Sequence, residues 1–203
     1  LTLSSKDKTM QSTEIGREFL ARVSEYLVSF PFDLKILQEA ITEPDLERSA
    51  RELAASVLIG ALSPQEGSGP ERFVDDVVLL RIALARIAKE GGEEAAGFCT
   101  RFGEVYSKLD DDLRIFEQSL GPELWSWLSA RPGSFCRLPL KGKRASQYVD
   151  DPSSWDQLYE DGVDFQTNYD VTESQIQNKL RRPEQLIEIL QRRHAEDVKK
   201  RGG

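Results

Sequence analysis

The chain has very few of the residues that structural metal sites and disulfides require. Among its 203 residues are one histidine, His194, and two cysteines, Cys99 and Cys136. A structural zinc site takes about four ligands from these residue types, so a site of this kind is excluded. The two cysteines lie far apart and outside any Cys-x-x-Cys motif, and we expect free thiols. His194 has no serine or cysteine partner nearby, so no catalytic role is assigned to it.

Long apolar runs are also missing. The sequence contains no stretch of 18 uncharged apolar residues and no secretory hydrophobic region near its N-terminus, so we expect a cytoplasmic protein. Runs of β-branched residues are scarce, whereas Ala, Leu, Glu and Arg are prominent and charged residues make up 31% of the chain. This composition favours an all-α fold, an irregular multi-helix bundle with no sheet. Without a strand, no glycine-rich phosphate loop can follow one.

Proline, glycine and changes of charge divide the chain into parts. Phe30-Pro31 and Gly121-Pro122 predict helix ends, and Asp33 is a candidate cap for a short helix over 34–41. The predicted organisation is a flexible N-terminal segment (1–11), a main helical domain (12–130), a basic loop (131–145), a C-terminal helical portion packed on the main domain (146–191) and a flexible basic tail (192–203).

A charged residue interrupts the most apolar segment, 73–87. On a helical wheel Arg81 falls near the middle of the arc formed by the aliphatic residues of this segment. An unpaired guanidinium on a buried face is too costly to keep, so we predict a carboxylate partner. Asp75 and Asp76 stand six and five residues before it and cannot reach it along the same helix. The structural ion pair is the favoured interpretation, and the alternative is that Arg81 binds a ligand phosphate or a partner carboxylate in a cleft.

Two groups of aspartates are candidates for chemistry. Asp75 and Asp76 open the apolar segment, and Asp110, Asp111 and Asp112 precede another one. Acids at a helix start cap orphan amides and complement the helix dipole, so capping, or for Asp75 and Asp76 an internal pair with Arg81, is the favoured interpretation. The alternative is a carboxylate metal or acid/base site to which both groups contribute.

Tryptophans mark possible contact surfaces. Trp125 and Trp127 stand two residues apart, so on a helix they point to nearly opposite sides, and the spacing allows one core residue and one exposed anchor. Trp155 begins an acidic amphipathic segment. An exposed tryptophan indicates a binding patch, although a core position is the more frequent one.

Charge is unevenly distributed along the chain, whose formal net charge is −8. Residues 150–173 carry eight acids and no Lys or Arg, whereas 137–144 carries four basic residues and no acid. The favoured interpretation is that the acidic helix and the basic loop neutralise each other within the fold. Alternatively, the loop contacts a phosphate backbone while Phe135 stacks on a base. The candidate residues are Phe135, Arg137, Lys141, Lys143 and Arg144 in the loop, and Asp156, Glu160, Asp161 and Asp164 in the acidic segment.

Residues 54–88 resemble the YkvA-like family of bacterial helical domains of unknown function. The resemblance rests on Ala54-Ala55-Ser56-Val57-Leu58-Ile59-Gly60-Ala61-Leu62-Ser63-Pro64 followed, after a turn, by Phe73-Val74-Asp75-Asp76 and an apolar helix. The turn itself differs, because Gln65-Glu66-Gly67-Ser68-Gly69 stands where the family typically has an Asp-x-Ile-Pro-Asp element. The resemblance implies a helical fold and an association role, and it implies no catalytic residue.

The sequence leads to one function hypothesis and two alternatives. The first is a non-catalytic protein-interaction or regulatory module, without a cofactor, whose acidic 150–173 surface selects a basic partner such as a nucleic-acid-binding protein. The second is a carboxylate-metal-dependent enzyme that uses Asp75, Asp76 and Asp110–Asp112. The third is weak nucleic-acid contact through the 137–144 loop.

Overall fold

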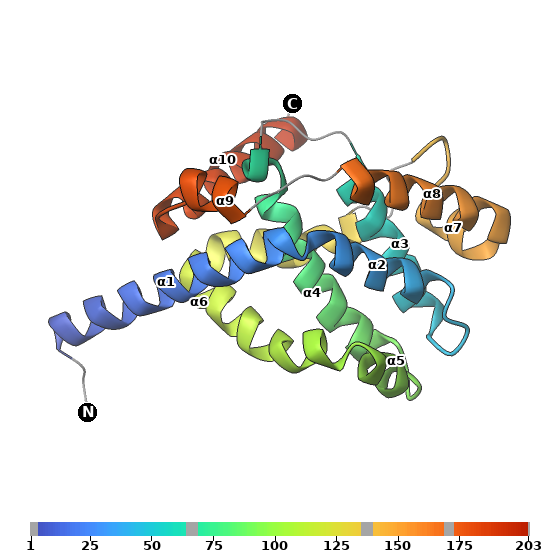
Figure 1. The fold of residues 1–203 in the computed structure, drawn as a ribbon, viewed down its shortest axis with the longest axis horizontal. Helices are drawn as coiled ribbons and strands as arrows, with labels where there is room; N and C mark the ends of the chain where they lie inside the picture. Colours follow the sequence, from blue (N-terminus) through green and yellow to red (C-terminus); the bar gives the residue numbers. More distant parts are fainter. Residues whose placement is uncertain (1–3, 64–68, 135–139, 169–172, 203) are drawn as a thin grey trace.

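The computed structural model describes residues 4–63, 69–134, 140–168 and 173–202. Within these ranges the chain is helical, no strand forms, and an isolated bridge joins Leu140 to Lys143, so the predicted all-α bundle is confirmed. Figure 1 shows the helices in order: α1 (Ser5–Val28), α2 (Phe30–Ile41), α3 (Arg48–Leu62), the 3₁₀ helix η1 (Gly69–Phe73), α4 (Val74–Glu90), α5 (Ala95–Arg101), α6 (Gly103–Ser134), α7 (Ala145–Asp150), α8 (Pro152–Asn168), α9 (Glu173–Lys179) and α10 (Pro183–Gly202).

Helix α4 lies at the centre of the bundle (Figure 1) and packs against α1, α2, α3 and α6. Every residue from Val74 to Leu84 is buried. A helix that is apolar on all sides is stable only when other helices surround it, and this explains why α4 has so little exposed surface. The same environment encloses three charged residues, Asp75, Asp76 and Arg81.

The corner between α1 and α2 differs from the sequence prediction. α2 begins at Phe30 rather than near residue 34, with Pro31 in its first turn. A proline costs nothing there because the first amides of a helix have no intrahelical acceptor. The N-cap is Ser29, so the prediction that Asp33 caps this helix is wrong. Asp33 instead lies buried on the face of α2 that meets α4.

Helix α6 bends at Gly121. Its backbone angles there are φ 79° and ψ 170°, a combination that only glycine adopts readily. The break predicted at Gly121-Pro122 is confirmed. The prediction that Asp110–Asp112 cap a helix start is wrong, because α6 begins at Gly103 and all three acids lie inside it.

The segments predicted as flexible ends are largely helical. α1 begins at Ser5, and α10 continues to Gly202 instead of ending near 191. The basic loop is also shorter than predicted, since residues 131–134 belong to α6. α10 continues because Arg193 and Asp197 contact α4 and α6. No helix in the described ranges has the length and apolar character needed to cross a bilayer.

The C-terminal third of the chain packs in two places. α7 and α8 lie against α3 and α2, whereas α9 and α10 lie against α1, with α10 also touching α4 and α6. In Figure 1 α9 and α10 lie in the upper left part of the view, and α7 and α8 lie in the upper right part. Two separate surfaces of the N-terminal helices are therefore covered.

Candidate functional site

Arg81 lies at the centre of a buried charge network, with only 2% of its surface exposed. Its Nη2 lies 3.1 Å from Oδ2 of Asp33, and its Nη1 lies 3.7 Å from Oδ2 of Asp112. The guanidinium also rests on the ring of Tyr26, 3.6 Å from its centroid, an arrangement that favours a cation. The prediction that the partners of Arg81 come from elsewhere in the chain is confirmed.

Asp112 connects this network to the surface of the bundle. Its Oδ1 accepts hydrogen bonds from the hydroxyl of Tyr26 and from Nη1 of Arg22, each at 2.6 Å. Arg22 also pairs with Asp111 at 2.6 Å. The phenol of Tyr26 has its pKa raised by burial and by its hydrogen bond to Asp112. The network therefore joins α1, α2, α4 and α6 through charged side chains.

Asp33 is the carboxylate of this network with the most unusual environment. Burial raises its pKa from 3.8 to about 6, although Arg81 opposes that rise. A cavity of about 130 Å³ lies beside Asp33 and Arg81, and Ser29, Glu25 and Lys108 also line it. Sequence reasoning missed Asp33 as a member of the site. The available signal was an acid among the apolar residues of 30–41.

Asp75 and Asp76 belong to a second network at the start of α4. Asp75 pairs with Arg131 at 3.2 Å and with Arg193 at 3.4 Å, so α6 and α10 both supply a cation. The pKa of Asp76 is raised well above its ordinary value, first by burial and then by the neighbouring carboxylate of Asp75, while the two arginines oppose the rise. Asp75 and Asp76 lie in the first turn of α4, but its N-cap is Phe73, so the prediction that they cap the helix is wrong. The predicted pair with Arg81 is wrong too, because the cations beside Asp75 are Arg131 and Arg193.

The two groups of aspartates do not form a common metal site. Asp112 is bound to Arg22 and Tyr26, whereas Asp75 faces Arg131 and Arg193. Within the part of the chain that the structure describes, no three His, Cys, Asp or Glu side chains are placed to hold a metal ion. Asp112 and Asp75 therefore belong to two separate ion networks.

Trp125 and Trp127 are both partly buried and pack against the core, so neither is the exposed anchor that their spacing allowed. The indole of Trp127 donates a hydrogen bond of 2.9 Å to Asp197, and the ring of His194 lies 5.0 Å from it. The guanidinium of Arg131 lies over the ring of Trp127, 4.8 Å from its centroid. Trp127 therefore helps to hold α10 against α6.

The basic loop and the acidic helix contact each other, as the favoured interpretation predicts. Lys141 pairs with Asp161 at 2.7 Å, and Lys143 donates a hydrogen bond of 2.7 Å to the hydroxyl of Ser154. The amide of Arg144 donates to the side chain of Gln147 at the start of α7. Phe135 and Arg137 lie outside the described residues, and so does the side chain of Asp164.

One face of α8 carries aromatic and acidic side chains together. Trp155 is partly buried and packs against the core, whereas its neighbours on this face are exposed. The rings of Trp155 and Tyr159 stack with centroids 5.1 Å apart, and Tyr159 is 45% exposed. Asp156 and Glu160 are exposed beside them. Val163, one turn further on, is 38% exposed. We call this set the α8 face.

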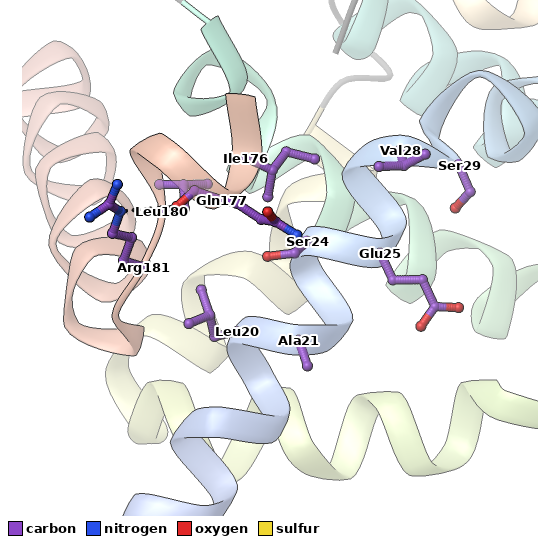
Figure 2. A pocket seen from close by; sticks show the side chains of 10 residues that line it. All are labelled: Leu20, Ala21, Ser24, Glu25, Val28, Ser29, Ile176, Gln177, Leu180 and Arg181. Carbon is purple, nitrogen blue, oxygen red and sulfur yellow. Dashed lines mark hydrogen bonds between the residues drawn. The ribbon is translucent and has the colours of Figure 1, made fainter. Parts of the chain in front are cut away.

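A large hollow lies between α1 and α9. Its volume is about 760 Å³, and Figure 2 shows side chains of α1, among them Leu20 and Ser24, opposite Ile176, Gln177 and Leu180. The lining is mostly apolar. The sequence analysis missed this hollow, because it forms only where two helices far apart in the chain come together.

Comparisons of the chain with protein-family models, with curated proteins and with solved structures find no match.

Proposed function

We propose that the chain is a non-catalytic protein-binding module that docks a partner with a basic surface on the α8 face. The observation that carries the proposal is the stacked pair Trp155 and Tyr159, exposed in part and bordered by Asp156 and Glu160. Trp and Tyr are the residues most enriched at the energetic centres of interfaces. Acidic groups around them steer and select a positively charged partner.

The neighbouring charges support the choice of this face over the rest of the acidic segment. Asp161 is paired with Lys141, Asp150 is paired with Arg48, and Asp151 accepts hydrogen bonds from Ser153 and Ser154. These acids are already satisfied inside the fold. Asp156 and Glu160 are exposed and lie next to Tyr159 on α8, and they supply the charge that a basic partner would meet.

A charge-reversal experiment tests the proposal. Wild-type protein, D156K/E160K and the control E184K/E188K are each used to recover partners from host cells, and the recovered protein is then purified for binding isotherms at two salt concentrations. The control has the same spacing and charge change on exposed positions of α10. We expect D156K/E160K to weaken binding by about tenfold or more, equal to about 1.4 kcal/mol, and higher salt to weaken wild-type binding.

Three results would contradict the proposal. The first is a partner that binds D156K/E160K as tightly as it binds wild type. The second is recovery of the chain alone as a monomer. The third is an equal loss of binding in D156K/E160K and E184K/E188K, which would show that net charge determines the affinity and not the α8 face.

We further propose that the module works in the cytoplasm and that its YkvA-like resemblance over 54–88 reflects an association role. The resembling residues form α3 and α4, which pack against each other at the centre of the bundle. On this proposal α3 and α4 form the scaffold, and α8 forms the surface that contacts the partner. Fractionation of host cells tests the location.

A further inference from the structure

Helix α10 has one side that faces the bundle and one that faces solvent. Leu186 and Leu190 are buried on the inner side. Arg193 and Asp197 continue that side at spacings of three and four, and they contact α4 and α6. The helical period therefore turns a different set of side chains, between these positions, away from the bundle.

The solvent side of residues 192–199 combines positive charge with exposed apolar surface. Val198 is 55% exposed, and Ala195 is exposed one turn before it. Arg192 and Lys199 lie on the same side, three residues before Ala195 and four residues after it. Both cations are exposed, and neither side chain has an ion-pair partner among the residues that the structure describes. We call this set the α10 face.

The charges that border the α10 face leave it basic. Glu196 follows Arg192 at a spacing of four, and Lys200 follows Glu196 at the same spacing, so these two charges offset each other. Arg201 is already paired with Asp197 at 3.1 Å.

The α8 face is complementary to the α10 face in charge and similar to it in apolar exposure. Asp156 and Glu160 are exposed, and in the described ranges neither carboxylate has an ion-pair partner. Tyr159 and Val163 are 45% and 38% exposed beside them. From Asp156 to Val163 the α8 face spans seven residues, about 10 Å of helix, and the α10 face has the same length.

The two faces lie on different parts of one molecule. α8 packs against α2, α3 and α7, whereas α10 packs against α1, α4 and α6. Figure 1 shows α8 in the upper right part of the view and α10 in the upper left part. A contact between the two faces therefore joins two molecules.

We propose that the α8 face of one molecule binds the α10 face of a second copy of this chain. This inference rests on the proposed function of the α8 face and names its basic partner. The acids of one face meet the cations of the other, and the exposed apolar side chains of both faces cover one another. Each copy carries both faces, so the contact forms twice in a closed pair or once between successive copies in a chain.

A nucleic acid fits the α10 face less well than a second copy does. A phosphate backbone would pair with Arg192 and Lys199, but the net charge of −8 opposes its approach and nothing would cover Val198. The α8 face supplies both the acids and the apolar surface that this side of α10 lacks.

Sedimentation equilibrium of the purified chain at low and high salt tests the proposal. Two turns of helix form a small interface, so we expect reversible association at micromolar to submillimolar concentrations, weakened by salt. D156K/E160K and R192E/K199E should each weaken self-association by about tenfold or more. R17E/R182E is the matched control, since it makes the same charge change as R192E/K199E at exposed positions outside the α10 face, and it should associate as wild type does.

Charge exchange separates the proposed contact from an effect of net charge. Replacement of two acids by lysine changes the net charge of D156K/E160K from −8 to −4, so lower repulsion alone would strengthen its association, whereas we expect it to weaken. An equimolar mixture of D156K/E160K and R192E/K199E should associate within about threefold of wild type, because each variant keeps the face that the other has lost. The variant that carries all four changes should associate with itself for the same reason. Circular dichroism checks that each variant keeps the helix content of wild type.

Three results would overturn the inference. They are a wild-type chain that stays monomeric at submillimolar concentration and low salt, self-association that R192E/K199E and R17E/R182E weaken equally, and a mixture of the two face variants that associates no better than either alone. In each case a basic host protein that binds wild type and not D156K/E160K would still support the proposed function, so the two failures are distinguishable.

Discussion

At the scale of single residues, Arg81 keeps two carboxylates inside the bundle. Asp33 and Asp112 are 1% and 0% exposed, and both lie within ion-pair distance of its guanidinium. A buried ion pair adds little to stability compared with apolar residues of the same shape, but the loss of one partner leaves an uncompensated buried charge. The main contribution of Arg81 to stability is therefore that its loss would leave Asp33 and Asp112 buried without this cation.

Replacement of Arg81 by Met should lower the free energy of unfolding by about 3–5 kcal/mol, because it removes the charge while nearly conserving volume. Urea denaturation at pH 7 measures the change. R114M is the matched control on α6, since Arg114 is 55% exposed and its surface pair with Asp111 is worth about 1 kcal/mol or less. A loss in R81M no larger than that in R114M would refute the role given to Arg81.

The need of Arg81 for a partner could be predicted from the sequence, because its position on an apolar face is a local property. The identity of the partners could not, because Asp33 and Asp112 stand 48 and 31 residues away and are brought near only by packing. Both acids do leave a local signal. Asp33 stands among apolar residues, and Asp112 stands at helical spacing from Leu109 and Phe116. Both were assigned to capping because that role is the commoner one for aspartate near a helix start.

At the scale of elements, α10 is held to the bundle by polar contacts from its second half. Arg193 pairs with Asp75 and also donates to the carbonyl of Arg72, while Asp197 accepts from Trp127. The basic composition of 192–203 indicates a solvated tail, and nothing in its periodicity reveals two docked side chains. The helix break just before Phe30-Pro31 and the one at Gly121 are easier to predict because backbone chemistry largely determines them.

Truncation after Gln191 should lower the free energy of unfolding by about 2–4 kcal/mol, since it removes a cation from buried Asp75 and the acceptor of the Trp127 indole. Truncation after Val198 keeps both contacts and removes only the exposed pair of Arg201 with Asp197, so it should change the free energy of unfolding by less than about 1 kcal/mol. Thermal and urea unfolding of both proteins measure the effect. Equal stability of the two truncated chains would show that the contacts of α10 contribute nothing.

At the scale of the whole molecule, five aspartates form two groups with opposite effects on stability. Asp33 and Asp76 are buried and have raised pKa values. Asp111, Asp150 and Asp151 are exposed, and their pKa values are lowered by hydrogen bonds from arginine or serine. A raised carboxyl pKa means that the folded state binds the proton more tightly, so stability falls as pH rises; a lowered pKa has the reverse effect.

The contribution of Asp33 can be isolated by comparison with D33N, which keeps the shape of the protonated acid. Its folded pKa of about 6 exceeds the ordinary 3.8, so its contribution to stability is full below pH 3.8 and is lost as pH rises towards 6 and beyond. The stability of wild type relative to D33N should thus fall by about 2–3 kcal/mol between pH 4 and pH 7. Urea denaturation across this range measures it. A relative stability that rises with pH would contradict the environment described for Asp33.

The bend at Gly121 has a consequence for how far these effects can be separated. The segment of α6 before it presents Asp112 to one ion network, and the segment after it presents Arg131 and Trp127 to the other. The φ and ψ angles of Gly121 therefore set the angle between these two segments of α6. A Cβ at this position would meet no atom within 4 Å. The positive φ angle is therefore what excludes an L side chain at Gly121, and not lack of space. D-alanine introduced there by chemical ligation would restrict the backbone to this conformation and keep the two segments of α6 in place, whereas L-alanine would change the angle between them.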